Sequence, residues 1–306
     1  MLAYLIYSKN DLKKNEWYIE SYQEEATKRG IDLQLLIAEE LTYGIKNQQW
    51  FLSSNGVLLP KPAFAIVRTI DPMLSRQLEY QGIRVFNNAK VAEICNNKAK
   101  TYQYVAKLNI PMIETCFYQN YQFFDAMAKN PYEQAVVKAV AGHGGSQVFL
   151  IDNLIEKNQE LEEHNADKNE SERKHYLETV FEKLEGQDFV LQPLTGHRHQ
   201  DLRVYVLGDK IIGAVLRTAK EGFRSNFSLG GTVECYELSE TELEIVNKII
   251  GLFDFGLVGL DFIIGDDKEL IFNEIEDVVG ARMLYQCHPE INLTGIYLDY
   301  ILSHLM

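Results

Sequence analysis

The chain has 306 residues, a formal net charge of −14, and a composition of 46% hydrophobic and 24% charged residues. These proportions exclude a disordered, collagen-like or low-complexity chain and indicate about two folded domains. The excess of acids repels phosphate backbones, so we expect no general binding of nucleic acid. No uncharged stretch reaches the ~20 residues of a membrane span, and the N-terminus lacks a signal-peptide pattern. We therefore expect a soluble, cytoplasmic protein with no membrane partner.

The four cysteines form no CxxC pair and predict no metal or redox motif. They are Cys95, Cys116, Cys235 and Cys287. We expect reduced thiols that lie in the core.

Residues 1–95 alternate short apolar segments with one amphipathic segment. We expect a helix over Glu16–Arg29, ended by Gly30, and strands over Leu2–Tyr7, Ile31–Ile37, Phe64–Arg68 and Arg84–Phe86. The alternation of strand and helix predicts a small open sheet with right-handed crossovers. The turn at residues 8–11 lacks the GxGxxG pattern of a dinucleotide site, so we expect a Rossmann-like shape without a cofactor signature.

The remaining chain opens with a predicted helix over residues 97–108, stopped by Pro111, and then alternates period-two strands with turns. Strands are predicted over Gln134–Lys138, Gln147–Ile151, Phe189–Gln192, Leu202–Leu207, Ile211–Arg217, Leu257–Ile264 and Glu269–Ile275. A helix is predicted over Glu240–Phe253 with Ser239 as its N-cap. The strongly acidic segment 152–188 is predicted to form a solvated helix pair with a disordered middle around residues 165–171.

Lys138 ends a predicted strand and is followed by a glycine-rich turn at residues 141–146. Glycine lets backbone N–H groups approach a phosphate chain closely, and a lysine beside the turn supplies a point charge. The pattern is not a Walker A loop, which needs GxxxxGK(S/T) at the start of a helix. A plain hairpin turn with a surface lysine is the alternative interpretation.

Three acids fall on two adjacent predicted strands, Asp261 on the first and Glu274 and Glu276 on the second. Residues two apart on a strand share a face, and pairing of the two strands lets Asp261 face the glutamates. Apolar neighbours surround all three, so the carboxylates could not all stay ionised without a cation. Oxygen-only ligands suit Mg²⁺ or Mn²⁺. A polar sheet edge with unrelated charges is the alternative.

A run of cations stands out in this acidic chain: Arg203, Arg217, Lys220 and Arg224. The first two lie on predicted strands, where an unpaired charge is costly. The arginine side chain presents a fork that suits phosphate and carboxylate oxygens. Salt bridges to the surplus acids are the alternative.

Together these features describe a site for ATP, Mg²⁺ and an anion, and their order resembles the RimK-like branch of the ATP-grasp ligases over residues 85–305. The matching segments are Asn97-Lys98 opening a helix that ends in Asn-Ile-Pro, Val136-Val137-Lys138 before the glycine-rich turn, Leu191-Gln192-Pro193-Leu194, Asp201-Leu202-Arg203, Arg217 through Asn226 followed by Gly230-Gly231, and Asp261 with Glu274-Ile275-Glu276.

The resemblance implies an α/β (α+β) class structure, an ATP-grasp fold with an N-terminal Rossmann-like pre-ATP-grasp domain. Residues 1–95 would form that domain, residues 96–190 the small lobe with a glycine-rich lid loop, and residues 191–306 the large lobe with the metal and phosphate site. The implied nucleotide-binding residues are Lys98, Lys138, Gly144, Gly145, Gln192, Pro193, Leu194, Asp201, Arg224, Ser225 and Asn226. The implied metal ligands are Asp261, Glu274 and Glu276, and the implied catalytic residues are Arg203, Arg217 and Arg224.

The activity implied by the resemblance is ATP-dependent ligation of a carboxylate to an amine through an acyl phosphate, with release of ADP and phosphate. The implied cofactors are ATP and Mg²⁺, with Mn²⁺ as an alternative ion. The implied partners are a small-molecule or peptide carboxylate and an amine such as an amino acid, and a homo-oligomer stays open. Two alternatives remain: a degenerate ATP-grasp protein that binds nucleotide without turnover, and a kinase that stops at phosphoryl transfer.

The chain departs from the family pattern at three places. Pro193 replaces the usual hinge acid, and Glu276 replaces the usual asparagine ligand. Residues 277–282 lack the usual small-polar–Pro–Gly turn on the acceptor side. We therefore infer no particular acid or amine from the resemblance.

Overall fold

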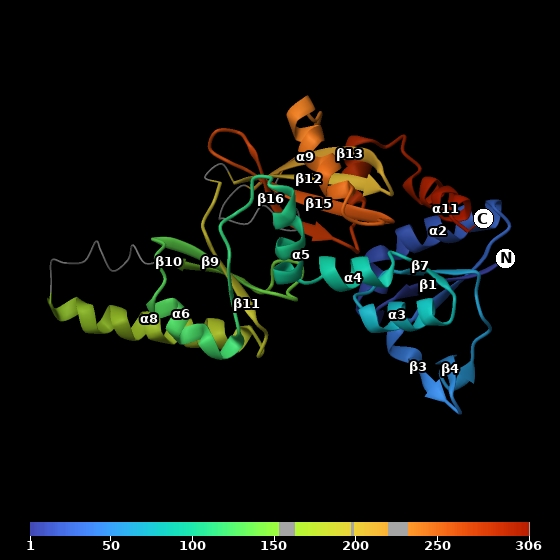
Figure 1. Cartoon of the computed structure of the whole chain (residues 1–306), viewed down its shortest axis with the longest axis horizontal. Helices are drawn as coiled ribbons and strands as arrows, with labels where there is room; N and C mark the ends of the chain where they lie inside the picture. The colour runs from blue at the N-terminus through green and yellow to red at the C-terminus, as the bar shows by residue number, and fades with distance from the viewer. Residues whose placement is uncertain (153–162, 197–198, 220–231, 306) are drawn as a thin grey trace.

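The computed structural model describes residues 1–152, 163–196, 199–219 and 232–305, with the backbone alone for residues 163–169. Figure 1 shows an elongated molecule with an N-terminal domain at one end, a small lobe at the other and a larger sheet between them. Both chain termini lie at the N-terminal domain. No helix among the described residues is long and apolar enough to cross a membrane.

The N-terminal domain is built on a parallel sheet with strand order β2-β1-β6-β7. The strands are β1 (Leu2–Tyr7), β2 (Asp32–Ile37), β6 (Phe64–Val67) and β7 (Arg84–Phe86). Its helices are α1 (Lys9–Leu12), α2 (Glu16–Lys28), α3 (Pro72–Tyr80) and α4 (Ala89–Cys95). The four predicted strands and the helix over residues 16–29 are therefore confirmed, with ends that shift by one residue.

The central strand β1 is covered on both faces, which explains its unbroken apolar sequence. Leu5 and Tyr7 point into the core cluster that contains α2, whereas Tyr4 and Ile6 point into the cluster that contains α3. The C-terminal helix α11 (Leu293–Ser303) returns to this domain and packs against α2. The last helix of the chain thus completes the core of the first domain.

A second, antiparallel sheet projects from the N-terminal domain and was not predicted. It contains β3 (Leu41–Lys46), β4 (Gln49–Ser54) and β5 (Val57–Leu58). Its turns hold Asn47, Gln48 and Asn55 at positive φ, as tight hairpins require. These strands expose much of their apolar surface, so they lack the alternating pattern of burial on which sequence prediction depends.

The small lobe has an antiparallel sheet of strand order β10-β9-β11-β8 among the described residues. The strands are β8 (Cys116–Tyr118), β9 (Gln134–Ala139), β10 (Val148–Asp152) and β11 (Phe189–Pro193), and helices α6 (Phe123–Ala128) and α8 (Glu163–Lys183) cover one face. The predicted hairpin of β9 and β10 is confirmed, with Val137 opposite Phe149. The sheet runs through Pro193, beyond the predicted domain boundary at residue 190.

The acidic segment differs from its prediction. Residues 165–171 are helical and belong to α8, a single helix of 21 residues, and residues 153–162 lie outside the described part. A polar helix needs only a short apolar anchor: α8 buries Val180 near its C-terminal end, and Leu184, which directly follows the helix, is buried in the same cluster. The predicted disordered middle is therefore wrong.

The larger sheet is antiparallel, with strand order β14-β13-β12-β15-β16. The strands are β12 (Gln200–Leu207), β13 (Lys210–Thr218), β14 (Thr232–Tyr236), β15 (Leu257–Ile264) and β16 (Leu270–Glu276). Helices α5 (Lys98–Val105), α9 (Glu240–Ile250) and α10 (Arg282–Cys287) flank it. Ser239 caps α9 in a capping box with Glu242, which confirms the predicted N-cap, while the helix ends three residues before the predicted Phe253.

The cysteines are only partly where we expected them. All four are free thiols, but Cys95 alone is buried and Cys235 is exposed. The thiol of Cys235 on β14 lies 3.4 Å from the carbonyl oxygen of Cys287, so two cysteines far apart in the sequence are neighbours. The prediction of four core thiols is therefore wrong for Cys235.

Deleting residues 165–171 should leave the free energy of unfolding within about 0.5 kcal/mol of wild type in a urea titration. The deletion removes about two helical turns, so the packed C-terminal end of α8 keeps its orientation. Deletion of residues 177–183 is the matched control, because it removes the same length but includes the buried Val180 and should cost several kcal/mol. Equal losses for the two deletions would contradict this assignment of the anchor.

Candidate active site

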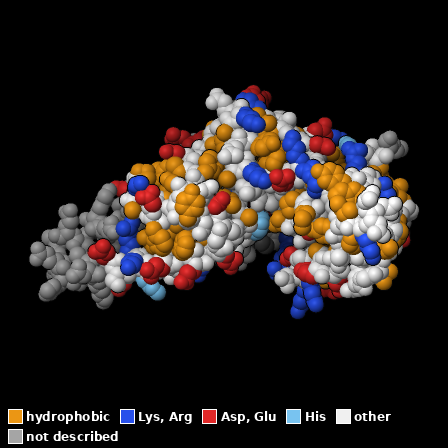
Figure 2. Space-filling model, turned by 60° about the horizontal axis from the view of Figure 1, so that its bottom comes forward, with side chains coloured by type: hydrophobic (Ala, Val, Ile, Leu, Met, Phe, Trp, Pro, Cys, Tyr) orange, Lys and Arg blue, Asp and Glu red, His pale blue; other side chains and the backbone are white. Residues whose placement is uncertain are grey.

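A cavity of about 560 Å³ lies where the N-terminal domain, the small lobe and the larger sheet meet. We call it the central cavity. Figure 2 shows the surface indented between the small lobe and the rest of the molecule. Most of the predicted site residues line the central cavity: Lys98, Lys138, Gly144, Gly145, Gln192, Pro193, Leu194, Asp201, Arg217, Asp261, Glu274 and Glu276. Arg203 lies behind them in the sheet, and Arg224, Ser225 and Asn226 fall outside the described residues.

The segment between the two lobes forms one wall of the central cavity. The backbone N–H of Leu194 donates to Gln134 O (2.9 Å), and the amide of Gln192 donates to the Thr115 hydroxyl (2.8 Å). The amide oxygen of Gln192 is buried without a hydrogen-bond partner among the described residues. This wall is therefore fixed by the small-lobe sheet and still offers one unused acceptor.

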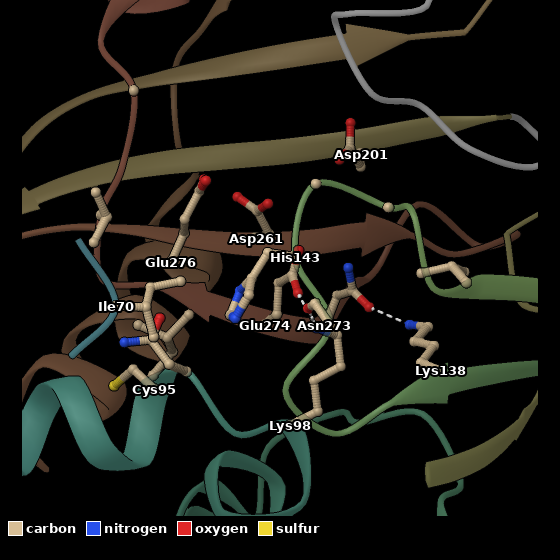
Figure 3. Close-up of a pocket in the computed structure, with 18 of the residues that line it drawn as sticks. Ile70, Cys95, Lys98, Lys138, His143, Asp201, Asp261, Asn273, Glu274 and Glu276 are labelled. Atoms are coloured by element: carbon tan, nitrogen blue, oxygen red, sulfur yellow. Dashed lines mark hydrogen bonds and ion pairs between the residues drawn. The ribbon is translucent and has the colours of Figure 1, made fainter. Parts of the chain in front are cut away.

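Lys138 reaches from β9 across the cavity to the larger sheet. Its Nζ donates to Asn273 Oδ1 on β16 at 2.9 Å (Figure 3). Burial, together with the nearby Lys98, lowers the pKa of Lys138 to about 8, while the charge of Glu274 opposes that shift. Because Lys138 is half-buried and its hydrogen-bond partner is a neutral amide, an anionic ligand in the cavity would interact favourably with its charge.

The bulge in β16 explains the position of Asn273, which the sequence analysis missed. The register shifts between Asp261 and Phe262, so Asp261 pairs with Glu274 and Phe262 pairs with Phe272. The extra residue, Asn273, lines the same cavity as Glu274 although the two are adjacent in sequence. A strict period of two would have placed Asn273 on the opposite face.

Lys98 stands at the start of α5, whose N-cap is Asn97. Its Nζ donates to Gly142 O in the glycine-rich loop at 2.6 Å and lies 3.4 Å from Glu274 Oε2. Gly144 and Gly145 of that loop have positive φ, which favours glycine. The lysine therefore links the loop to the carboxylates on the opposite wall.

The buried floor of the cavity is a chain of five charged groups across neighbouring strands, which we call the charge ladder. In order it is Asp201, Arg217, Asp261, Arg203 and Glu276. Arg203 Nε and Nη2 hold the two oxygens of Asp261 at 2.7 and 2.6 Å, and its Nη2 lies 2.5 Å from Glu276 Oε2. Arg217 joins Asp261 (3.0 Å) to Asp201 in the same way.

The charge ladder changes the interpretation of the two arginines. Arg203 and Arg217 are only 7% and 4% exposed, and carboxylates of the chain itself take up their donors. The acids that pair with them lie on adjacent strands, as in the salt-bridge alternative. The catalytic role that the resemblance implies for the two arginines stays a prediction.

The three predicted metal ligands lie on one wall but in different environments (Figure 3). The side chains of Glu274 and Glu276 are 37% and 40% exposed in the cavity, whereas that of Asp261 is 2% exposed. Burial alone would raise the pKa of Asp261, but Arg203 and Arg217 outweigh it and hold that pKa at about 2. Within the described residues, no three carboxylate, imidazole or thiolate groups converge closely enough to hold a metal ion.

These environments fit a divalent cation only in part. Mg²⁺ in proteins commonly takes one or two carboxylates together with substrate phosphates. Glu274 and Glu276 meet that requirement. Burial raises the pKa of Glu276, and the positive charge of Arg203 offsets that rise only in part. Asp261 does not meet it, since both of its oxygens accept from guanidinium groups.

Several residues of the N-terminal domain that were not predicted also line the central cavity, among them Tyr7 and Arg68. Arg68 directly follows β6, at the carboxyl end of the parallel sheet. Ligands of open α/β sheets commonly bind at that edge, so the position of Arg68 was a signal that the sequence did contain.

Comparison with known proteins agrees with this geometry. A model of the RimK-like ATP-grasp domain matches residues 95–301. Human β-citrylglutamate synthase B is 26% identical over 290 residues, which cover 90% of this chain and 70% of that protein. Human N-acetylaspartylglutamate synthase A is 28% identical over 257 residues, so the match spans 81% of this chain but only 60% of that relative.

A solved structure extends the likeness to the whole chain. The ATP-grasp ligase PsnB, in a complex with a minimal precursor, Mg and ADP, aligns with a TM-score of 0.64 and 16% identity. The alignment covers 100% of this chain and 97% of that one, and at this identity it shows the fold. The predicted ATP-grasp fold is thus confirmed. The chain therefore belongs to the RimK-like ATP-grasp family, a family of ATP-dependent ligases.

Proposed function

We propose that the protein uses ATP to activate a carboxylate as an acyl phosphate and then joins that carboxyl group to an amine, with release of ADP and phosphate. The observation that carries this proposal is the meeting of Lys98 and Lys138 with the half-open Glu274 and Glu276 in one cavity. Cations on one wall and carboxylates on the other are what a nucleotide triphosphate with a divalent ion requires.

In this proposal the nucleotide lies along the small-lobe side of the central cavity. Apolar side chains by the interlobe segment, among them Val136 and Leu194, would contact the base. The amide oxygen of Gln192 is the free acceptor there. Lys138 and Lys98 would then neutralise phosphate oxygens, and the glycine-rich loop that Lys98 holds would cover them.

Glu274 and Glu276 would hold Mg²⁺, with Mn²⁺ as an alternative ion. The chemistry supplied by a bound ion would be neutralisation of the negative charge on the phosphate oxygens. Asp261 would not contact the ion in this proposal. Its negative charge offsets the positive charges of Arg203 and Arg217, so that Glu276 keeps part of its own charge for the ion. The charge ladder is then a positioning device beneath the glutamates.

The chemistry needs no nucleophilic side chain. The substrate carboxylate attacks the γ-phosphorus of ATP, ADP leaves, and the amine then displaces phosphate from the acyl carbon and loses a proton. Such transfers depend chiefly on positioning and on neutralising charge. The names of the two human relatives describe products in which glutamate carries a citryl or an N-acetylaspartyl group. We propose by analogy that the amine is an amino acid and that the acid is a small molecule or peptide.

Replacing Lys138 with methionine should lower the rate of ADP release by roughly 10²–10³-fold, because one charge that stabilises the transferring phosphate is lost. The unfolding temperature without ligand should not fall, since methionine is apolar and of similar length. Lys129→Met, at the C-cap of α6, is the control, because this exposed lysine pairs with Asp125 of that helix, far from the cavity lining. Full turnover in the Lys138 variant would remove this residue from the site.

The affinity for ATP in the absence of metal should fall as the pH rises from 7 to 9. Lys138 is charged below its lowered pKa of about 8 and neutral above it, so its attraction for phosphate is lost across that range. Lys138→Arg stays charged and should flatten the profile in titration calorimetry. A wild-type affinity independent of pH would show that this lysine does not contact the phosphates.

Glu274→Gln should abolish the extra thermal stabilisation that Mg²⁺ adds to ATP while leaving the smaller stabilisation by ATP alone. Glutamine keeps the shape of the side chain but removes the charge that holds the ion. Glu269→Gln, at the exposed turn of the same hairpin, should behave as wild type. A metal-dependent shift that survives in Glu274→Gln would exclude this carboxylate as a ligand.

Trapping with hydroxylamine tests the reaction class directly. With ATP, Mg²⁺ and a candidate acid such as N-acetylaspartate, glutamate or citrate, an acyl phosphate yields a hydroxamate. ADP that accumulates with these acids without hydroxamate would favour a kinase, and the absence of ADP with all of them would favour the degenerate scaffold.

A further inference from the structure

Arg68 is a buried cation that has no acidic partner. It is 5% exposed, and its backbone N–H donates to Ile6 O at 2.7 Å, which fixes it at the end of β6. Its Nη2 donates to Val279 O at 2.7 Å, and its Nε has no hydrogen-bond partner in the part of the chain that the structure describes. Among the described residues it forms no ion pair, in contrast to Arg203 and Arg217.

The groups around Arg68 do not supply the missing charge. The guanidinium lies 5.6 Å from the ring centroid of Tyr18. Burial raises the pKa of Tyr18 and of Tyr22, so both phenols stay neutral. The buried Asp277 is close enough to feel Arg68, but its two oxygens accept from Asn87 and Asn96. The Tyr7 hydroxyl also lies against Arg68, but a neutral phenol adds no counter-charge, so the guanidinium has one carbonyl oxygen and one hydroxyl beside it and no carboxylate.

Tyr7 adds a second unused polar group at the same place. Its hydroxyl is buried beside the Arg68 guanidinium, and within the described part of the chain no other group pairs with it. Tyr7 is 1% exposed and lines the central cavity with Arg68 and Thr69. A buried charge and a buried hydroxyl without partners both cost stability. Such a cost is expected where a ligand completes the site.

This pair lies at the end of the cavity away from the proposed nucleotide. Ile70, two residues after Arg68, lies beside Glu276, on the opposite side of the carboxylates from Lys138 (Figure 3). The segment that accepts from Arg68, at Val279, directly follows the carboxylate pair of β16. A molecule that reacts with the γ-phosphate near Glu274 and Glu276 would extend toward Arg68.

We propose that Arg68, assisted by Tyr7, binds a carboxylate of the substrate that is not the one being activated. The proposal rests on the ligase function proposed above and adds that one substrate carries a second anionic group. The carboxylate belongs either to the acid, which is then a dicarboxylate or larger, or to the amino acid that supplies the amine. A planar fork of donors with one carbonyl partner suits a carboxylate in either case.

Arg68→Met should raise the dissociation constant of one such ligand by roughly 10–100-fold, the usual effect of losing hydrogen bonds to a charged group. Titration calorimetry in the presence of Mg²⁺ and ADP measures this without turnover. Comparing the dissociation constants of succinate and its monoamide tests whether the second carboxylate belongs to the acid substrate. Comparing those of glutamate and glutamic acid α-amide tests whether it belongs to the amine substrate. Wild type should prefer the carboxylate in one of these pairs, and Arg68→Met should lose that preference. Arg68→Lys should restore part of it.

The design separates binding from a purely structural role. Arg84→Met, an exposed arginine on the neighbouring strand β7, is the matched control and should bind as wild type. Tyr7→Phe tests the hydroxyl with the fold kept, and should weaken the same ligand by a smaller factor. The affinity for ADP should be unchanged in all variants.

The outcomes are distinct. No preference in wild type for either carboxylate, or a preference that Arg68→Met retains, would overturn the subsite. Equal losses for ADP and for the carboxylate would also overturn it, by showing that Arg68 only holds the segment at Val279. Because binding is read without chemistry, a protein that binds in this way but forms no hydroxamate would refute the proposed reaction alone.

Discussion

The charge ladder is the constraint on which the rest of the site depends. Five charged groups lie on one face of the larger sheet, and burying charges is favourable only when each is paired. The strand register provides those pairs, since Asp201 lies opposite Arg217 and Arg203 lies opposite Asp261. Removing Arg217, for example, would leave the buried Asp201 without its partner in the ladder. The ladder has three acids and two bases, so a negative charge remains, and it emerges at Glu276 on the cavity wall.

The cations that face the remaining negative charge at Glu274 and Glu276 are lysines rather than arginines. Lys138 comes from β9 of the small lobe and Lys98 from the start of α5, and they contact the larger sheet at Asn273 and at Glu274 respectively. A lysine bound to an amide is held less firmly than an arginine bound to a carboxylate. The charge ladder therefore holds its arginines firmly on carboxylates. Lys98 and Lys138, in contrast, could exchange their present contacts for phosphate oxygens.

The sequence predicted the four strands of the parallel sheet, most strands of the two lobes, the N-cap at Ser239 and the order of the motifs, because each depends on residues close together in the chain. It failed where the deciding contact is distant. Nothing near Arg203 reveals that Asp261, 58 residues away, will occupy its donors. Likewise the bulge that turns Asn273 into the cavity depends on pairing with β15. The acidic segment was misjudged for a different reason: its composition indicates solvation, but helix formation needs only the anchor at Val180.

The segment that departs from the family pattern, residues 277–282, links the N-terminal domain to the carboxylates of β16 through contacts at Asp277 and Val279. Asn87 donates to both the side chain and the backbone of Asp277, and Arg68 donates to Val279 O. An acid at position 277 is thus explained by internal hydrogen bonds and not by a ligand. Because the same contacts orient Arg68, the altered turn and the unpaired arginine form one arrangement. Substrate selection would then reside where the N-terminal domain meets β16, apart from the nucleotide machinery on the small-lobe side.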